Sequence, residues 1–402
     1  MIKKILFILY ILILICMAAA SIVEKLEGTD YAHVHYYGAW WFILIWAALA
    51  ALGIFYIIQR KVKAVSTWAL HLSFVIILVG AFITHVNGKQ GMMHLRIGEP
   101  SDIYFSNNPA EGIQQRRLPF TLSLQKFDIH LYEGTDVVRD YTSQFMVTDH
   151  YEMEEAKVSL NRIYTHGSYR FYQASYDEDG MGSVLAINSD PFGIPVTYCG
   201  YFLLFLSLVW ILFDKKGGYR KLLQRSWQQF RSLLMVVFSL VGIGFIFLIY
   251  HFSHIDFSTG DRAPILNSPY FCVHVSVIMM SYVLLILTCL CGILGICWRS
   301  RRERMQALSR LFLYPALTTM GFGIFIGAIW ANVSWGTYWS WDSKETWALI
   351  TFMIYAVVVH TQSLPVFRKP LVYHIYVTLA FLSIAMTYFG VNFFLTGMHS
   401  YA

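Results

Sequence analysis

The sequence predicts a polytopic α-helical membrane protein of about nine transmembrane helices, with one small, mainly β extracytoplasmic domain inserted after the third helix. Hydrophobic residues make up 57% of the 402 residues and charged residues only 13%, whereas a soluble globular domain carries roughly 25% charged residues. Many apolar residues stand in runs long enough to cross a bilayer. Residues 87–193 differ, because apolar and polar residues alternate there.

The apolar runs give the expected positions of the helices. A helix needs about 17 to 25 mostly apolar residues to cross the hydrocarbon core of a membrane. Such runs occur at 5–22, 39–59, 68–86, 194–213, 233–250, 271–296, 311–331, 346–362 and 371–395. The first run follows Lys3 and Lys4 and ends in small residues at 18–21, so it also resembles a cleavable signal peptide. Either interpretation leaves the later topology unchanged.

The basic residues assign the two sides of the membrane. Alternating spans place eighteen of the 30 Lys and Arg residues on one side, together with only two acidic residues, Asp214 and Glu303. The positive-inside rule identifies this side as the cytoplasm. The basic tract at 215–231 is therefore interpreted as a cytoplasmic loop that sets the topology, and nucleic acid is not expected as a partner. The inserted domain and the C-terminus are expected on the extracytoplasmic side.

Residues 87–193 are expected to form an antiparallel β-sandwich or a curled sheet. Phe120, Leu122 and Leu124 alternate with polar residues, and a second alternation begins at Phe127. Turn residues such as Gly167 separate the further expected strands at 141–148, 157–164, 169–176 and 183–188. The predicted domains are therefore 1–86 with three helices, 87–193 as the β domain, 194–232 with the fourth helix and the basic loop, and 233–402 as a second membrane domain.

A cluster of tryptophans marks one loop between two apolar runs. Five of the twelve Trp residues fall between Trp330 and Trp347, and they surround the sequence Trp339-Ser340-Trp341-Asp342. So much flat aromatic surface suits a large planar ligand. The alternative is an aromatic belt, since Trp is enriched where membrane helices meet water. A belt requires neither the glycine nor the acid of this loop.

Histidines near the span ends are candidate metal ligands, because ionisable residues within a membrane are costly and mostly mark pathways or cofactors. His274 and His399 are expected at the same face as the tryptophan cluster. Two imidazoles beside flat side chains suit a six-coordinate haem iron. His71 and His360 are expected near the inner face as a second pair, with His374 as a rival for the place of His360. The alternative for each is an interfacial imidazole bonded to a backbone carbonyl.

These motifs resemble a known family. The sequence Trp335-Gly336-x-x-Trp339-x-Trp341-Asp342-x-Lys344-Glu345-x-Trp347 resembles the tryptophan-rich motif of the haem-handling proteins of cytochrome c maturation. The motifs around it, which contain His274, His360 and His399, are similar to the CcsA (ResC) half of the System II cytochrome c synthase. His71-Leu72-Ser73 and the stretch at 161–176 resemble its partner, CcsB or ResB. The resemblance covers most of residues 60–402 and implies a fusion of the two halves.

The resemblance implies a route for haem b, which is both substrate and transiently bound ligand. A pair matching His71 and His360 binds haem in a bacterial plasma membrane. Residues of the tryptophan motif then hold it outside between His274 and His399, which are the expected catalytic residues and axial ligands; the motif residues are Trp335, Gly336, Trp339, Trp341 and Asp342. The thiolates of a Cys-x-x-Cys-His segment of apocytochrome c add there to the haem vinyl groups. Catalysis by such a protein consists largely of orientation.

Two other functions stay open at the level of sequence. One is a haem transporter or chaperone that delivers haem without attaching it, and the other is a membrane cytochrome b that carries electrons. The expected partners are haem, apocytochrome c and a thiol-reducing thioredoxin-like protein, because the six cysteines include no Cys-x-x-Cys pair. Lys344 and Arg262 are candidates for pairing with haem propionates. Asp342 and Glu345 are expected to orient a ligand or to cap the following helix.

Overall fold

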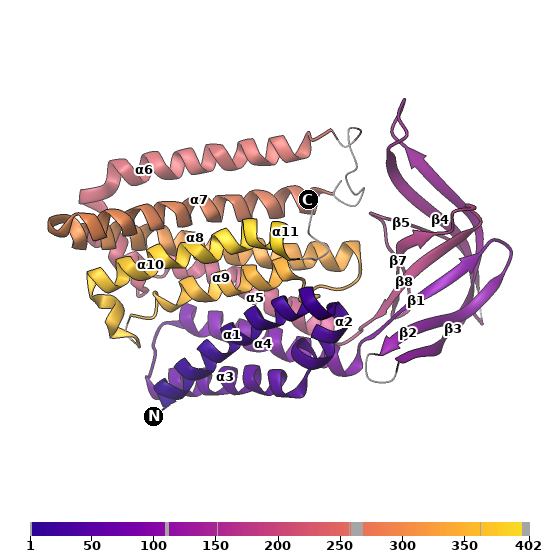
Figure 1. Cartoon of the computed structure of the whole chain (residues 1–402), viewed down its shortest axis with the longest axis horizontal. Coiled ribbons are helices and arrows are strands. Elements are labelled where there is room, and N and C mark those ends of the chain that lie inside the picture. The colour runs from indigo at the N-terminus through magenta and orange to yellow at the C-terminus, as the bar shows by residue number, and fades with distance from the viewer. Residues whose placement is uncertain are drawn as a thin grey trace.

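The computed structural model describes residues 2–108, 112–150, 152–256, 258, 268–361 and 363–395. A bundle of roughly parallel helices carries a β domain at one end (Figure 1). The long helices are α1 (Ile2–Glu27), α3 (Trp40–Gln59), α4 (Val65–Asn87), α5 (Gly193–Phe213), α6 (Gly218–Ser253), α7 (Pro269–Cys297), α8 (Arg302–Ser334), α9 (Ser343–Val357) and α10 (Pro370–Ala385). Shorter turns are α2 (Thr29–Ala32), α11 (Val391–Phe394), two π-helical turns (His33–Tyr37 and Met386–Gly390) and two 3-10 turns (Arg299–Arg301 and Pro365–Arg368).

The helices confirm a multi-pass membrane protein. Seven helical stretches of the described residues are long and apolar enough to cross a membrane, and one of them, Gly193–Ser253, contains both α5 and α6. Helix α9 has only 15 residues, fewer than the predicted run at 346–362. The helix ends where three consecutive β-branched residues, Val357 to Val359, precede His360, and such residues lower helix propensity. The count of nine spans stays a prediction.

The basic tract at 215–231 is not a loop, and that expectation is wrong. Only residues 214–217 connect α5 to α6, and α6 continues for 36 residues from Gly218. The tract is rich in Lys, Arg, Gln and Leu and contains no Pro, so its intrinsic preference is helical although it is too polar to be read as a span. About the first four turns of α6 therefore carry the basic residues.

The β domain is one antiparallel sheet of eight strands in the order β5-β4-β3-β2-β1-β8-β7-β6. Its strands are β1 (Lys89–Arg96), β2 (Pro100–Asn108), β3 (Gly112–Leu131), β4 (Val138–Thr148), β5 (Met153–Ser159), β6 (Tyr164–His166), β7 (Tyr169–Tyr176) and β8 (Gly182–Ser189). Edge strand β5 lies against β6 and β7 at the other edge, so the sheet is curled around its apolar core. The curled sheet, one of the two predicted forms, is confirmed.

Several strand boundaries differ from the prediction for local reasons. A bulge between Leu124 and Lys126 interrupts the pairing of β3 with β4. The extra residue shifts the alternation of side chains, which explains why the sequence showed two alternations within the single strand β3. The strand expected at 157–164 ends at Ser159, where Ser159 and Arg162 close a turn. Strands β1 and β2 were not predicted, because their exposed apolar residues, such as Met92 and Phe105, obscure the pattern.

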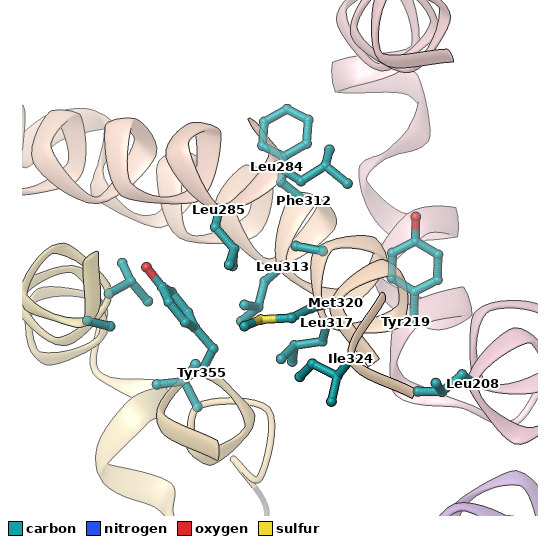
Figure 2. Packing of buried hydrophobic residues seen from close by; sticks show 14 of the residues in the cluster. Leu208, Tyr219, Leu284, Leu285, Phe312, Leu313, Leu317, Met320, Ile324 and Tyr355 are labelled. Carbon is teal, nitrogen blue, oxygen red and sulfur yellow. The ribbon is translucent and has the colours of Figure 1, made fainter. Parts of the chain in front are cut away.

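Helix α8 forms the centre of the bundle. Its buried residues Leu313, Leu317, Met320 and Ile324 meet side chains of the neighbouring helices, among them Leu285 of α7, Tyr355 of α9 and Leu208 of α5 (Figure 2). A second apolar cluster joins α1 and α3 to α9 through residues such as Met17, Phe42 and Met353. Both ends of α9, where the candidate site residues lie, are therefore held by packing on two sides.

Candidate functional site

The structure brings His71 and His360 together at the end of the bundle away from the β domain. Their ring centroids are 6.1 Å apart and the ring planes are nearly perpendicular, at 86°. His71 lies near the start of α4, and His360 lies in the turn after α9. An iron bonded to both rings at about 2 Å, with each nitrogen about 1 Å from its ring centroid, requires centroids roughly 6 Å apart. The spacing of the two rings therefore suits one shared metal.

Backbone carbonyls set the protonation of both rings. The Nδ1–H of His71 donates to the Thr67 carbonyl at 2.8 Å, and the Nδ1–H of His360 donates to the Ala356 carbonyl at 2.8 Å. Each carbonyl lies four residues earlier in the chain. With Nδ1 protonated, the neutral ring carries its lone pair on Nε2, which is the arrangement that second-shell bonds give to metal-ligating histidines. Both imidazoles thus have an unprotonated Nε2, the atom that could bind a metal.

His374 lies elsewhere. Its Nε2 bonds the carbonyl of Arg302 at 2.9 Å, and its side chain is completely buried between α10, α7 and α8. Its Nδ1 has no partner among the described residues. By contrast, Phe74 lies one turn after His71 and contacts Phe352 of α9 at 6.2 Å between centroids, which adds aromatic surface near the pair. The geometry favours His360 as the companion of His71.

The tryptophan loop, residues 335–342, lies at the opposite end of α9, beside the β domain. The 15 residues of α9 correspond to about 22 Å of helix between this loop and the turn that carries His360. Gly336 has φ +89°, and a Cβ atom there would lie 2.6 Å from Cε2 of Tyr172 in β7. The side-chain amide of Asn188 in β8 donates to the Gly336 carbonyl. Gly336 is therefore explained by close packing against the β domain.

The tryptophans of the loop do not form one flat platform. Trp339 and Trp341 are perpendicular, with an angle of 88° between the planes and 5.8 Å between centroids. Tyr37 is stacked on Trp341 at 4.8 Å and 6°. Trp330 and Trp335 meet edge to face at 5.3 Å. The indole Nε1 of Trp339 is buried without an acceptor among the described residues, so it is a hydrogen-bond donor available to a ligand.

The polar residues of the motif hold the loop and the start of α9. The Asp342 carboxylate accepts from the backbone N–H of Lys344 at 2.9 Å, so it is the N-cap of α9, as expected. Glu345 accepts from the backbone N–H of Ser340 at 2.9 Å. The Lys344 ammonium donates to the side chain of Asn392 at 2.9 Å, which joins the tryptophan loop to the C-terminal motif.

His274 lies on α7 at the same end as the loop. Its Nδ1–H donates to the Gly323 carbonyl of α8 at 2.8 Å, and its ring centroid lies 6.0 Å from that of Trp330. A Cβ atom on Gly327 would lie 2.6 Å from the imidazole, so the glycine makes room for the ring. His274 thus has the same tautomer as the inner pair. His399 and Arg262 lie outside the described residues.

Sequence reasoning missed a polar junction between the two halves of the chain. The hydroxyl of Thr84 in α4 donates to Asp190 at 2.5 Å and lies 2.8 Å from the Tyr338 hydroxyl. Burial raises the pKa of Tyr338, and hydrogen bonds from Thr197 and Thr84 partly oppose the rise. In the sequence, Thr84 and Asp190 stand at the two ends of the β domain with no motif around them. Only their placement as its two connections to the membrane makes them neighbours of the loop.

Comparison with known proteins agrees with this division into halves. A model described as the cytochrome C assembly protein family matches residues 196–399, and a model of the ResB-like family matches residues 62–197. Protein NrfI of Wolinella succinogenes is 34% identical over 203 residues, which are 46% of this chain and 22% of that protein.

The chain is also similar to two proteins named cytochrome c biogenesis protein CcsA. The protein of Guillardia theta is 34% identical over 168 residues, which cover 34% of this chain and 56% of that protein. The protein of Chlamydomonas reinhardtii is 35% identical over 151 residues, covering 34% of this chain and 42% of that protein. The chain therefore spans between about a fifth and just over half of the length of these relatives.

Proposed function

Because this chain belongs to the cytochrome C assembly protein family and carries a ResB-like half in front of that region, we propose that it works in cytochrome c biogenesis as a haem-handling synthase. Haem b binds first between His71 and His360. It is then held at the tryptophan loop beside His274 and His399, and is joined there to the Cys-x-x-Cys-His segment of apocytochrome c.

The spacing of His71 and His360 carries the proposal. Two rings from distant parts of the chain stand 6.1 Å apart, and each donates its Nδ1–H to a carbonyl four residues earlier. The spacing is what distinguishes the pair, because His254 also bonds the carbonyl four residues earlier, that of Tyr250, at 2.8 Å. Ligation by two neutral imidazoles suits an iron porphyrin, whose four remaining ligands are its own ring nitrogens.

The outer site supplies orientation rather than a reactive group of its own. Each thiolate sulfur forms a carbon–sulfur bond with one vinyl group, and a proton adds to the other vinyl carbon, so the attachment itself needs no oxidant. Holding the vinyl carbons against the thiols converts a bimolecular addition into a positioned one. His274, fixed by the Gly323 carbonyl, would hold the iron, and the Trp339 indole N–H offers a donor to the edge of the haem.

The arrangement of the helices supports an orientation in a bacterial plasma membrane. The connections at 60–64, 214–217 and 298–301 lie at the end of the bundle away from the β domain (Figure 1). Basic residues are concentrated in and beside these connections, which the positive-inside rule places in the cytoplasm. The β domain and the tryptophan loop then face the extracytoplasmic side, where a thioredoxin-like partner would keep the thiols of apocytochrome c reduced.

The visible spectrum of the purified chain tests the inner site. We expect a low-spin bis-imidazole spectrum that is lost in His71→Gly and in His360→Gly and is restored by added imidazole. His374→Gly is the matched control, since it removes a buried imidazole from the same end of the bundle but leaves the pair intact. Absence of bound haem in the wild type, or spectra indifferent to both changes, would refute the site.

Product formation separates attachment from delivery. Co-expression with apocytochrome c is expected to give covalent haem that stays with the polypeptide in acid-acetone. The change His274→Gly should abolish this product while the inner haem remains. A chain that binds haem but never yields covalent product with reduced apocytochrome would be a transporter or chaperone instead.

A further inference from the structure

The segment Ser21–Tyr37 lies outside both family matches, yet it contacts the tryptophan loop directly. It comprises the end of α1, the short helix α2 and the π-helical turn His33–Tyr37. The Nε2–H of His33 donates to the Ser340 carbonyl at 2.9 Å, and Tyr37 is stacked on Trp341. These contacts reach consecutive residues of the loop.

Further contacts follow the loop into α9. The hydroxyl of Ser343 donates to the Glu24 carboxylate at 3.4 Å, and the Trp347 indole N–H donates to the Ser21 hydroxyl at 3.0 Å. Glu24 is 5% exposed, although a carboxylate is rarely buried without partners. The two segments are more than 300 residues apart in the sequence. Hydrogen bonds and ring stacking between them indicate a specific interface rather than general apolar packing.

The backbone at Trp341 makes the stacking informative. Trp341 has φ +59°, a left-handed conformation that costs a residue with a side chain some free energy. Tyr37 covers one face of this indole at 4.8 Å, and Phe42 contacts it edge to face at 5.4 Å. The contacts of these two rings with the indole stabilise the left-handed backbone conformation of Trp341. Trp341 is thereby turned toward the N-terminal helices, while Trp339 packs against the main core.

We propose that Tyr37 and His33 are positioning residues of the outer haem site: they hold Trp341 and Ser340, and thereby keep the indole N–H of the neighbouring Trp339, which has no acceptor among the described residues, in place as a donor to haem. Trp341 then anchors the loop and does not form a wall of the site. The expected effect on haem attachment rests on the proposed function. The contact that fixes the conformation of the loop does not, and it can be measured without haem.

Hydrogen exchange of the full-length chain tests the holding of the loop. In Tyr37→Ala, peptides that cover residues 335–345 should exchange roughly two- to tenfold faster, which corresponds to the loss of one aromatic pair. Tyr37→Phe keeps the stacked ring and should behave as the wild type. Tyr36→Ala is the matched control, because Tyr36 belongs to the same turn but contacts Trp41 instead. Unchanged exchange in Tyr37→Ala would overturn the inference.

Product formation tests the consequence for the site. Tyr37→Ala should lower the covalent yield per chain by roughly two- to tenfold, while the spectrum of haem at the inner pair stays unchanged, and Tyr37→Phe should restore the yield. Faster exchange with an undiminished yield would overturn the role in positioning. A wild-type chain that binds no haem would refute the proposed function, and the exchange experiment would still decide whether the segment holds the loop.

Discussion

Gly336 is needed in the tryptophan loop for two reasons, its backbone conformation and its close packing against Tyr172, and the substitution Gly336→Ala tests both. At φ +89° an alanine meets backbone strain of about 1–2 kcal/mol. Its Cβ would also lie 2.6 Å from Cε2 and 3.0 Å from Cζ of Tyr172, and overpacking of this kind costs about 1–3 kcal/mol. The expected total is about 2–5 kcal/mol against the docked loop.

The assay is amide hydrogen exchange of peptides from the loop and from β7 in the full-length chain. A loss of about 3 kcal/mol raises the local opening constant by roughly a hundredfold. Gly134→Ala is the matched control, because Gly134 has φ +74° but no atom lies within 4 Å of its Cβ position. The control should therefore show only the strain, in its own turn.

A double-mutant cycle isolates the steric part. Tyr172→Leu removes the ring that a Cβ at position 336 would meet, so the combination with Gly336→Ala should recover about 1–3 kcal/mol relative to the sum of the single changes. If Gly336→Ala costs no more than Gly134→Ala, or if the cycle shows no coupling, the packing argument is refuted. The need for glycine would then rest on the backbone conformation alone.

Three further outcomes follow from named contacts. Asp342→Ala should destabilise the start of α9 by about 1 kcal/mol, whereas Asp342→Ser should retain the cap; equal hydrogen exchange of residues 343–347 in both variants would contradict the cap. If Lys344 pairs with a haem propionate, as the sequence predicts, Lys344→Ala should lower haem retention at the proposed outer site; undiminished retention would remove Lys344 from the site. In the structure its ammonium bonds the Asn392 side chain. In the β domain, the Arg96 guanidinium holds the pKa of Asp179 below its usual range, so the stabilisation is present above about pH 4 and is lost as the pH falls through the lowered pKa. Arg96→Gln should reduce this acid sensitivity of β1, measured by hydrogen exchange corrected for intrinsic rates, and an unchanged pH profile would argue against the pair.

Local patterns in the sequence predicted much of the fold. Runs of apolar residues reveal spans because a bilayer demands about twenty of them in succession. Period-two alternation revealed β3, and turn residues bounded the segments that form β4, β7 and β8. The patterns failed in two places. The first turns of α6 are helical but too basic to be recognised as part of a span, and strands β1 and β2 carry exposed apolar side chains that hide their alternation.

The sequence by itself determined the membrane class, the inserted β domain, the tryptophan loop and the set of candidate histidines, since each depends on composition or on short-range spacing. The tertiary structure decided which residues meet. It paired His71 with His360 rather than His374, it turned Trp341 toward Tyr37, and it brought Tyr172 against Gly336. These neighbours lie far apart in the chain, and their proximity depends on how whole helices pack and how the sheet docks on them. No local pattern of residues records that packing.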